Sequence, residues 1–248
     1  MTSPSPGRPD SELLDANRHF YNALWTDARL IEPERFNTWP LVHSLLAPAQ
    51  RRLEVAPGLR PRLPIEDTQF VDISAAALEK LRARGGSGTL GSITALPYGN
   101  AGFDLICAFD VIEHVDDDER ALAELSRVAA YGAALITSVP LHPAQWSGFD
   151  AFVGHRRRYE PAELLDKLAR HGFAVERSAA FGMKPKSPRL VDLGMWFLIH
   201  QRAPAIRLYN RVMMPLGVRF QKPLALAQGL IDTAKVGEVL LLCRRGSS

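Results

Sequence analysis

The stretch FDLICAFDVIEHVDDDERALAELSRV, residues 103–128, decides the fold class of this chain. Its positions 105–109 are almost wholly apolar, which favours a strand covered on both faces in a parallel sheet. The polar residues Asp110, Glu113 and His114 follow directly. Because ligands of open α/β sheets bind outside the carboxyl ends of the strands, this loop is predicted to belong to a small-molecule site.

Four acidic residues, at positions 116–119, come after this loop. They suit the N-terminal cap and first turn of a helix, whose dipole favours negative charge. Leu122, Leu125 and Val128 would form the apolar face of that helix. A metal site is the other interpretation of the acidic run. The sequence shows no ligand cluster to match it, so a capped helix is preferred and no metal is predicted.

The composition indicates one globular domain, because 248 residues with 46% hydrophobic content suffice for a sizeable core. A net charge of +3 with scattered basic residues falls short of a nucleic-acid-binding surface. No signal-peptide core and no run of roughly 18 apolar residues is present, so no transmembrane segment is expected. Cys107 and Cys243 lie in apolar runs, where buried thiols are expected. These features predict a cytoplasmic protein.

Predicted strands and helices alternate through the middle of the chain. The strands are expected at residues 51–56, 68–74, 103–110, 133–140 and 173–180, and the helices at residues 76–86, 116–128 and 161–172. A probable last strand covers residues 237–245. This order is typical of parallel βαβ units in an α/β fold.

The expected organisation is a flexible tail (1–10) and a single domain (11–248). Within the domain we expect an N-terminal helical region (11–50), a core (51–183), a helical insertion (184–235) and the final strand (236–248). VDLGMWFLIHQ, AIRLYNRVMMPLGVRF and LALAQGLIDTA predict two or three apolar helices in the insertion. They would form either a cap over the site or extra core helices. Their apolar character also allows a hydrophobic acceptor or a homodimer.

A turn of small residues and a strand-end acid suit a ligand that carries a ribose. Ala56 and Gly58 follow a predicted strand and let a ligand approach the backbone, and Asp72 can accept hydrogen bonds from both ribose hydroxyls. This pattern is weak by itself, because any strand can end in aspartate.

Together with the loop after residue 109, the order of elements resembles the class I S-adenosylmethionine-dependent methyltransferases, in particular their small-molecule group. The resemblance covers about residues 52–181 and the last strand. It implies a Rossmann-like, seven-stranded, mostly parallel sheet with helices on both faces, and S-adenosylmethionine as cofactor. It places the cofactor contacts at Glu54, Ala56, Gly58, Asp72, Ile73, Ser92, Ile93, Thr94, Phe109, Asp110 and Val111, with Ser92 standing where the family usually has aspartate.

The first loop departs from the family pattern. It keeps one glycine, with Arg60 where the last glycine is usual, and Pro61 and Pro64 leave room for little more than one helical turn. A short helix offers few free N–H groups to the carboxylate of the cofactor, so Arg60 or Arg62 is expected to supply a charge-assisted contact. The reduced loop also suggests an alternative, a non-catalytic binding protein of the same fold. The missing G-x-G-x-x-G argues against a nicotinamide-dependent oxidoreductase.

The predicted reaction is methyl transfer to a small molecule, at a hydroxyl rather than at nitrogen or carbon. His114 is the candidate base, because its unperturbed pKa is near neutral. A histidine that caps the corner between strand and helix is the alternative. Glu113 is expected on the substrate side. Trp39, in the segment FNTWP, is expected in a lid, with Trp146 and Trp196 in other segments that fold over the cofactor.

The segment GHRRRY, residues 154–159, is similar to one that borders the substrate pocket in the same family branch. The resemblance implies that His155, Arg158 and Tyr159 bind an anionic or hydroxylated substrate. For Arg156 and Arg157, pairing with surface carboxylates is the alternative.

Overall fold

The computed structural model describes residues 28–182 and 207–246, and in addition Trp25, Trp196, His200, Gln201 and Pro204. The predicted tail at residues 1–10 lies outside the described residues. So do most of the N-terminal helical region before residue 28 and most of the expected helix VDLGMWFLIHQ.

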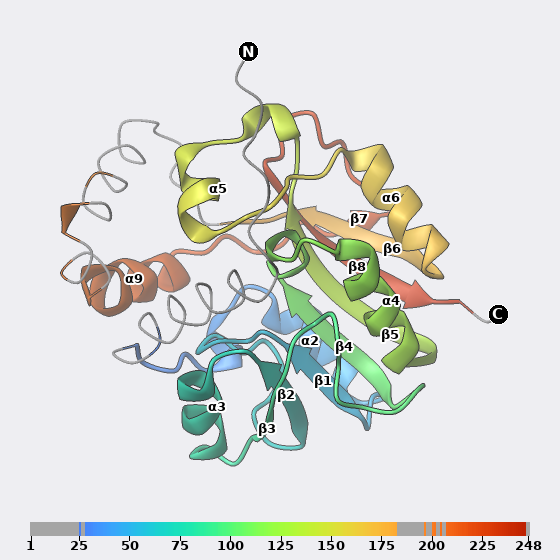
Figure 1. Cartoon of the computed structure of the whole chain (residues 1–248), viewed down its shortest axis with the longest axis horizontal. Coiled ribbons are helices and arrows are strands. Elements are labelled where there is room, and N and C mark those ends of the chain that lie inside the picture. Colours follow the sequence, from blue (N-terminus) through green and yellow to red (C-terminus); the bar gives the residue numbers. More distant parts are fainter. Residues whose placement is uncertain are drawn as a thin grey trace.

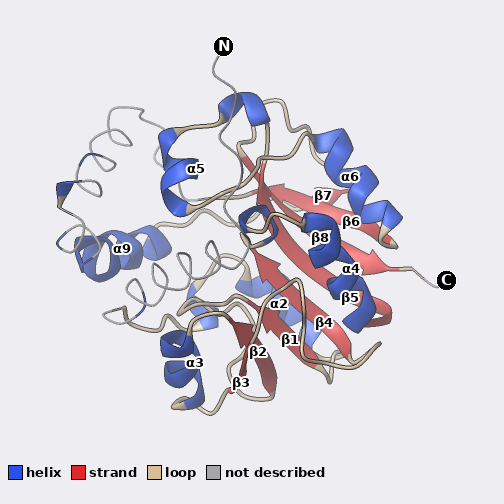
Figure 2. Cartoon of the chain, viewed as in Figure 1, coloured by secondary structure: helices blue, strands red, loops and turns tan. Residues whose placement is uncertain are grey.

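A single mixed sheet forms the centre of the protein (Figure 1 and Figure 2). Its order is β3-β2-β1-β4-β5-β8-β6-β7. The strands are β1 Arg52–Val55, β2 Thr68–Asp72, β3 Ser87–Leu90, β4 Phe103–Phe109, β5 Ala129–Pro140, β6 Phe173–Ala180, β7 Ala227–Gln228 and β8 Glu238–Arg245. The expected α/β fold is confirmed. The sheet has eight strands rather than seven, because the short β7 adds to the edge at β6.

The first five strands of this order pair in parallel, and β8 is antiparallel to both β5 and β6. The chain runs from β1 outward to β2 and β3 and then returns to β4 on the other side of β1. The strand order therefore reverses between β1 and β4. In open α/β sheets such a reversal marks the place where ligands bind, at the carboxyl ends of the two strands.

Helices cover both faces of the sheet, as expected. Figure 1 shows α4 (Asp118–Val128) and α6 (Pro161–Arg170) on the near side, where their apolar side chains join the largest buried cluster. On the opposite face, α2 (Trp39–Leu46) packs against the middle of the sheet and α3 (Ala75–Arg82) packs against β2. The shorter elements are the turns η1 Pro33–Arg35, η2 Ile112–His114 and η3 Pro143–Gln145, and the helix α5 Gly148–Val153.

The acidic run before α4 caps that helix. The side chain of Asp117 accepts a hydrogen bond from the backbone N–H of Arg120 at 2.8 Å. Leu122, Leu125 and Val128 are all buried. The interpretation of this run as a helix cap is confirmed, and the helix fixes the position of the loop between β4 and α4.

The insertion before β8 is only partly helical in the described residues. A π-helical turn, η4 (Tyr209–Met213), leads into α9 (Met214–Arg219), whose Met214 and Val218 pack against Phe36. The helix expected from LALAQGLIDTA is wrong, because this stretch is irregular apart from the two residues of β7. The backbone around Gly229 is held instead by the Ser178 hydroxyl of β6, which donates to the carbonyl of Gly229 at 2.8 Å.

Among the described residues, no helix is both long enough and apolar enough to cross a bilayer. Cys107 and Cys243 are buried free thiols in β4 and β8, as predicted.

Candidate active site

The loop after β1 has a backbone path that glycine adopts freely and other residues adopt at a cost. Gly58 has φ +54°, and Ala56 has φ +55°. The left-handed conformation costs a residue with a Cβ roughly 1–2 kcal/mol. Ala56 occupies a position where the resembled family usually has glycine. It adopts the same positive φ, which lowers the stability of the protein.

Glu54 holds this loop against the sheet. Its buried carboxylate accepts hydrogen bonds from the backbone N–H groups of Arg62, at 2.8 Å, and Leu63, at 2.9 Å. Burial raises the pKa of Glu54 to about 7, while these hydrogen bonds act in the opposite direction. The short helix expected after the loop is absent, because residues 57–67 form only turns. The structure thus places Glu54 as the residue that positions the loop.

Asp72, at the end of β2, joins that strand to the first loop. One carboxylate oxygen accepts from the N–H of Gly58 at 2.9 Å and the other from the N–H of Ser74 at 2.7 Å. Burial raises the pKa of Asp72 to about 6. Each carboxylate oxygen can still accept a further hydrogen bond. The neighbouring Ile73 is half-buried.

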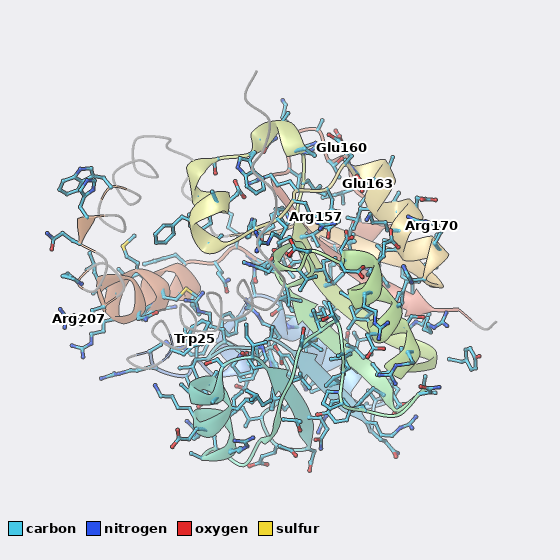
Figure 3. All side chains as sticks on the ribbon, viewed as in Figure 1. Trp25, Arg157, Glu160, Glu163, Arg170 and Arg207 are labelled. Atoms are coloured by element: carbon cyan, nitrogen blue, oxygen red, sulfur yellow. The ribbon has the colours of Figure 1, made fainter. Side chains whose placement is uncertain are left out.

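Trp25 covers Gly58, a contact that the sequence did not predict. A Cβ added to Gly58 would overlap the Trp25 indole. The indole is buried beside Leu59 and Ala77, and the guanidinium of Arg60 lies 5.1 Å from its ring centroid. Figure 3 shows Trp25 above the loops at the start of α3. Trp25 therefore lies over the loop where the resemblance places the cofactor.

Arg62 lies in a cage of three aromatic rings. Its Cζ is 3.7 Å from the ring centroid of Phe36, 5.2 Å from that of Phe109 and 6.0 Å from that of Phe181. The side chain is buried, and its Nη1 has no hydrogen-bond partner among the residues that the structure describes. Burial lowers the pKa of Arg62 to about 10, and the carboxylate of Glu54 opposes that shift. A buried cationic donor is thus available where β4 ends.

The loop expected to hold the adenine is tied to α4. The hydroxyls of Ser92 and Thr94 lie 2.9 Å apart, and Ile93 is buried in the core between them. The side chain of Arg120, from α4, donates to the Thr94 carbonyl at 3.2 Å. These contacts make the loop a fixed wall beside β2 and β3.

The loop after β4 begins with a second strained residue. Asp110 has φ +47° and is exposed, and the Ser138 hydroxyl donates to its carboxylate at 2.6 Å. Phe109 is half-buried and Val111 is buried. Ala56 and Asp110 thus both take positive φ at the carboxyl ends of β1 and β4, which pair in parallel. Such strain concentrates at functional sites.

Beyond Asp110 the structure brings two distant segments together. Glu113 and His114 lie in η2, and His155 lies 3.8 Å from Glu113, measured from Nε2 to Oε1. The rings of His114 and His155 meet edge to face with centroids 4.7 Å apart. Burial, followed by the charge of His155, lowers the pKa of His114 to about 3, and a hydrogen bond with the backbone of Gly154 opposes the shift. His114 is therefore a weak base on its own.

These three side chains could also ligate a metal ion. Each offers one ligand atom, and the three atoms lie within 4.8 Å of one another. The sequence predicted no metal ligands here, because the acidic run at positions 116–119 was the one candidate that it offered. His114 and the histidine of GHRRRY are far apart in the chain, and only the fold brings them together with Glu113.

The other residues of GHRRRY have structural partners. The Arg158 guanidinium is buried and donates to Asp150 at 3.0 and 3.1 Å. Tyr159 is buried and donates its hydroxyl to Asp118 at 3.0 Å. Contact of Arg158 and Tyr159 with substrate stays a prediction. The alternative of a surface ion pair is confirmed for Arg156, which pairs with Asp116 at 3.2 Å. Arg157, labelled in Figure 3, pairs at 2.8 Å with Asp118, a carboxylate that is buried.

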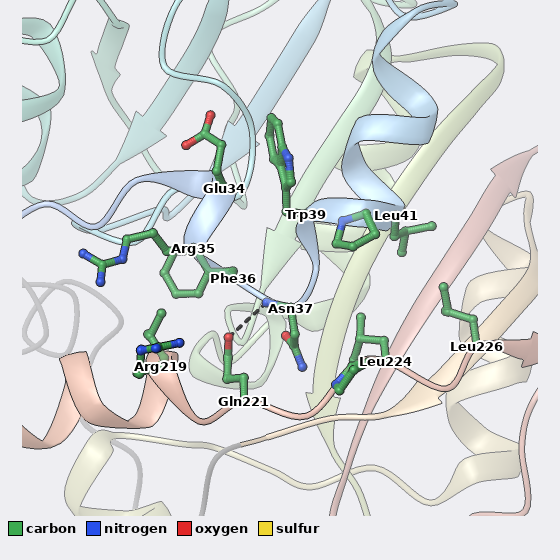
Figure 4. A pocket seen from close by; sticks show the side chains of 13 residues that line it. Glu34, Arg35, Phe36, Asn37, Trp39, Leu41, Arg219, Gln221, Leu224 and Leu226 are labelled. Atoms are coloured by element: carbon green, nitrogen blue, oxygen red, sulfur yellow. Dashed lines mark hydrogen bonds between the residues drawn. The ribbon is translucent and has the colours of Figure 1, made fainter.

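A cavity of about 460 Å³ lies between residues 34–41, which include the start of α2, and residues 218–226 of the insertion (Figure 4). Trp39 lines it, as do Phe36 and Leu224. Asn37 closes one side, because its backbone N–H donates to Gln221 at 3.0 Å, drawn as a dashed line in Figure 4. Trp146 and Trp196 are 44% and 52% exposed and do not line this cavity. The structure therefore does not bring the three tryptophans into one pocket there.

Comparison with known proteins finds similarity to methyltransferases. Residues 57–137 match a family model described as a methyltransferase domain. A probable S-adenosylmethionine-dependent methyltransferase from Mycolicibacterium smegmatis is 32% identical over 90 residues, which are 35% of this chain and 34% of that protein. The ajmaline N-methyltransferase of Rauvolfia serpentina is 38% identical over 53 residues, 21% of this chain and 18% of that protein. The matches thus span 34% or less of the length of these curated relatives.

Solved structures share the whole fold at low identity. A possible histamine N-methyltransferase from Thermotoga maritima, described as S-adenosylmethionine-dependent, has a TM-score of 0.56 and 18% identity, covering 95% of this chain and 93% of that one. The [4+2]-cyclase SpnF has a TM-score of 0.61 and 16% identity over 100% of both chains. A geranyl diphosphate methyltransferase solved with its substrate and sinefungin has a TM-score of 0.54 and 15% identity, covering 84% and 78%. At these identities the likeness establishes the fold.

Proposed function

We propose that this chain is a class I S-adenosylmethionine-dependent methyltransferase and that it methylates a small-molecule acceptor at a hydroxyl oxygen. Its fold and the match of residues 57–137 to a methyltransferase-domain model support this proposal. The observation that carries the proposal is the buried guanidinium of Arg62. It lies beside Phe109, where the strand order reverses between β1 and β4, and it can donate a hydrogen bond. A cationic donor there suits the carboxylate of the cofactor, in place of the helix N-terminus that the first loop lacks.

The remaining cofactor contacts follow from the same loops. Asp72 has free lone pairs for ribose hydroxyls, and Ser92 and Thr94 lie on the loop assigned to the adenine. The positive φ at Ala56 and Gly58 turns the first loop sharply at the end of β1. S-Adenosylmethionine supplies an electrophilic methyl group on its sulfonium. The chain must therefore bind it, orient the acceptor in line and take up the acceptor's proton.

The acceptor is proposed to bind on the side of Glu113, His114 and His155. In the simplest scheme His114 accepts the hydroxyl proton. Its lowered pKa makes this transfer inefficient without help from a neighbouring charge. The scheme predicts that His114→Ala loses most of the turnover and keeps cofactor affinity.

Calorimetric titration with S-adenosylmethionine tests the cofactor site, with Asp72→Asn as the site variant and Asp104→Asn as the control. Asp104 is paired with Arg51 at the opposite end of β4 from Asp110. Micromolar binding that Asp72→Asn weakens and Asp104→Asn preserves supports the proposal, and methyl transfer from labelled cofactor across hydroxylated acceptors completes it. Wild-type protein that binds no cofactor contradicts the proposal.

A second candidate is a binding protein of the same fold that does not transfer methyl groups. The contact of the Trp25 indole with Gly58 favours this candidate, because the indole lies over the loop assigned to the cofactor. It is also in keeping with a cyclase sharing the fold, since the fold does not fix the chemistry. Cofactor binding without turnover in the acceptor panel would identify this function.

Two further expectations belong to this proposal. The unpaired thiols of Cys107 and Cys243 are in keeping with a reducing cytoplasm, where we place the activity. A homodimer stays a prediction, which analytical ultracentrifugation tests.

A further inference from the structure

The side chains of Glu113, His114 and His155 converge from two segments of the chain. Their ligand atoms lie within 4.8 Å of one another. The Glu113 side chain is fully buried, and the His155 side chain is 9% exposed. A carboxylate and two imidazoles in so small a volume form the donor set of many three-ligand metal sites, which keep a further position for water or substrate.

The residues behind the cluster orient it in the way that metal ligands are usually oriented. Nδ1 of His155 lies 3.0 Å from Oδ1 of Asp150, which leaves Nε2 directed toward Glu113. Asp150 is itself fixed, because the Arg158 guanidinium and the hydroxyl of Ser147 both donate to it. A carboxylate that holds the far nitrogen of a histidine is the common outer contact of a metal ligand.

The second histidine is fixed as well. One ring nitrogen of His114 hydrogen-bonds the backbone of Gly154, the residue before His155. Arg156, whose charge acts on His114, is itself paired with Asp116 at 3.2 Å. The cluster is thus preorganised, and it carries the single negative charge of Glu113 when both imidazoles are neutral.

We propose that Glu113, His114 and His155 bind a divalent transition-metal cation such as Zn²⁺, Mn²⁺ or Fe²⁺. Imidazole and carboxylate donors select this class over Mg²⁺ and Ca²⁺, which prefer oxygen ligands throughout. Two of its three ligands, Glu113 and His114, lie in the loop after β4, within four residues of Asp110. This is the side on which the acceptor is proposed to bind.

The role of the cation rests on the proposed function. A hydroxyl bound to a divalent cation loses its proton near neutral pH, because the cation stabilises the alkoxide or phenoxide. The O–H bond breaks and the proton passes to solvent water. The oxygen then forms its bond to the methyl carbon as the bond from sulfur to that carbon breaks, and the sulfonium becomes a thioether. No oxidation occurs. This scheme replaces the simplest scheme given above, because His114 is here a metal ligand and water takes up the proton.

Cobalt binding tests the site directly. Full-length protein is stripped with chelator and titrated with Co²⁺, which reports nitrogen and oxygen ligation through its visible absorption. We expect one equivalent to bind to the wild type. His155→Gln and Glu113→Gln should each weaken binding by about a hundredfold or more, since even outer-contact changes cost 10- to 100-fold. Circular dichroism confirms that each variant is folded.

His171→Gln is the matched control, because His171 pairs with Glu119 at 2.7 Å outside the cluster. It should bind Co²⁺ as the wild type does. The inference is overturned if the wild type does not bind Co²⁺ stoichiometrically, whether or not the variants fold. It is also overturned if folded His155→Gln binds Co²⁺ as tightly as the wild type.

Titration of the same metal-free protein with S-adenosylmethionine separates the two proposals. Cofactor binding without Co²⁺ binding overturns the metal site and leaves the proposed function standing. Co²⁺ binding that depends on His155, in a protein that binds no cofactor, supports the metal site and contradicts the proposed function.

Discussion

The guanidinium of Arg62 stacks on the ring of Phe36, with Cζ 3.7 Å from the ring centroid. This contact joins the loop after β1 to the segment just before α2. Through Phe109, 5.2 Å from the same Cζ, it also reaches the end of β4. Three parts of the chain that are far apart in sequence thus meet at one buried cation.

Replacing Arg62 with methionine should weaken S-adenosylmethionine binding by about 10- to 100-fold, which corresponds to the roughly 1.5–3 kcal/mol of a hydrogen bond to a charged group. Methionine retains apolar contact with Phe36. Calorimetric titration measures the affinity, and Arg60→Met is the control, because Arg60 lies on the Trp25 indole. An equal loss of affinity in the two variants would mean that Arg62 does not bind the carboxylate of the cofactor.

Gly58→Ala should destabilise the protein by about 1–2 kcal/mol or more. The alanine must adopt the φ of +54° and also displace the indole of Trp25. Chemical denaturation measures the loss. Gly99→Ala is the control, since Gly99 is exposed and a Cβ there meets no atom within 4 Å. A stability change as small at Gly58 as at Gly99 would show that neither the backbone conformation nor the Trp25 cover matters.

Glu54 should make the protein less stable as the pH rises from 4.5 to 7. Burial raises the pKa of its carboxyl from 4.5 to about 7, so between these values the folded protein retains a proton that the unfolded chain has lost. The contribution to stability is complete below pH 4.5 and is lost as the pH approaches 7, to a total of up to about 3 kcal/mol.

The measurement is the free energy of unfolding at intervals between pH 4 and pH 8, for the wild type and Glu54→Gln. The wild-type curve should fall more steeply, because Asp72 and other groups contribute to both curves equally. Parallel curves would mean that Arg62, the cation beside Glu54, keeps the carboxylate ionised throughout.

Tyr159→Phe should cost about 1 kcal/mol of stability, the typical contribution of one buried hydrogen bond. Its hydroxyl donates to Asp118, which Lys167 also binds at 2.9 Å. If the predicted contact of Tyr159 with substrate exists, the variant should also raise the KM for acceptor. Thermal denaturation and the KM for acceptor are the two readouts, with the exposed Tyr131→Phe as control. Lowered stability with an unchanged KM would contradict the substrate contact.

Much of the fold follows from local sequence. Apolar runs at 105–109 and 133–140 predict buried parallel strands, and the acidic cap with Leu122 and Leu125 predicts α4, because strand and helix periods are properties of neighbouring residues. Two predictions failed where tertiary contacts decided the conformation. LALAQGLIDTA is not helical, because Ala227 and Gln228 pair with β6. The loop after β1 has no helix, because its N–H groups bind Glu54.

The sequence also indicated the candidate site, since Asp72, Asp110 and Glu113 each follow a strand whose direction is predictable. It did not indicate which partners those residues would meet. Trp25 over Gly58, the aromatic cage of Arg62 and the meeting of His155 with Glu113 are contacts between residues far apart in the chain. Periodicity within one segment carries no information about them, so only the packing of the segments around the sheet determines these contacts.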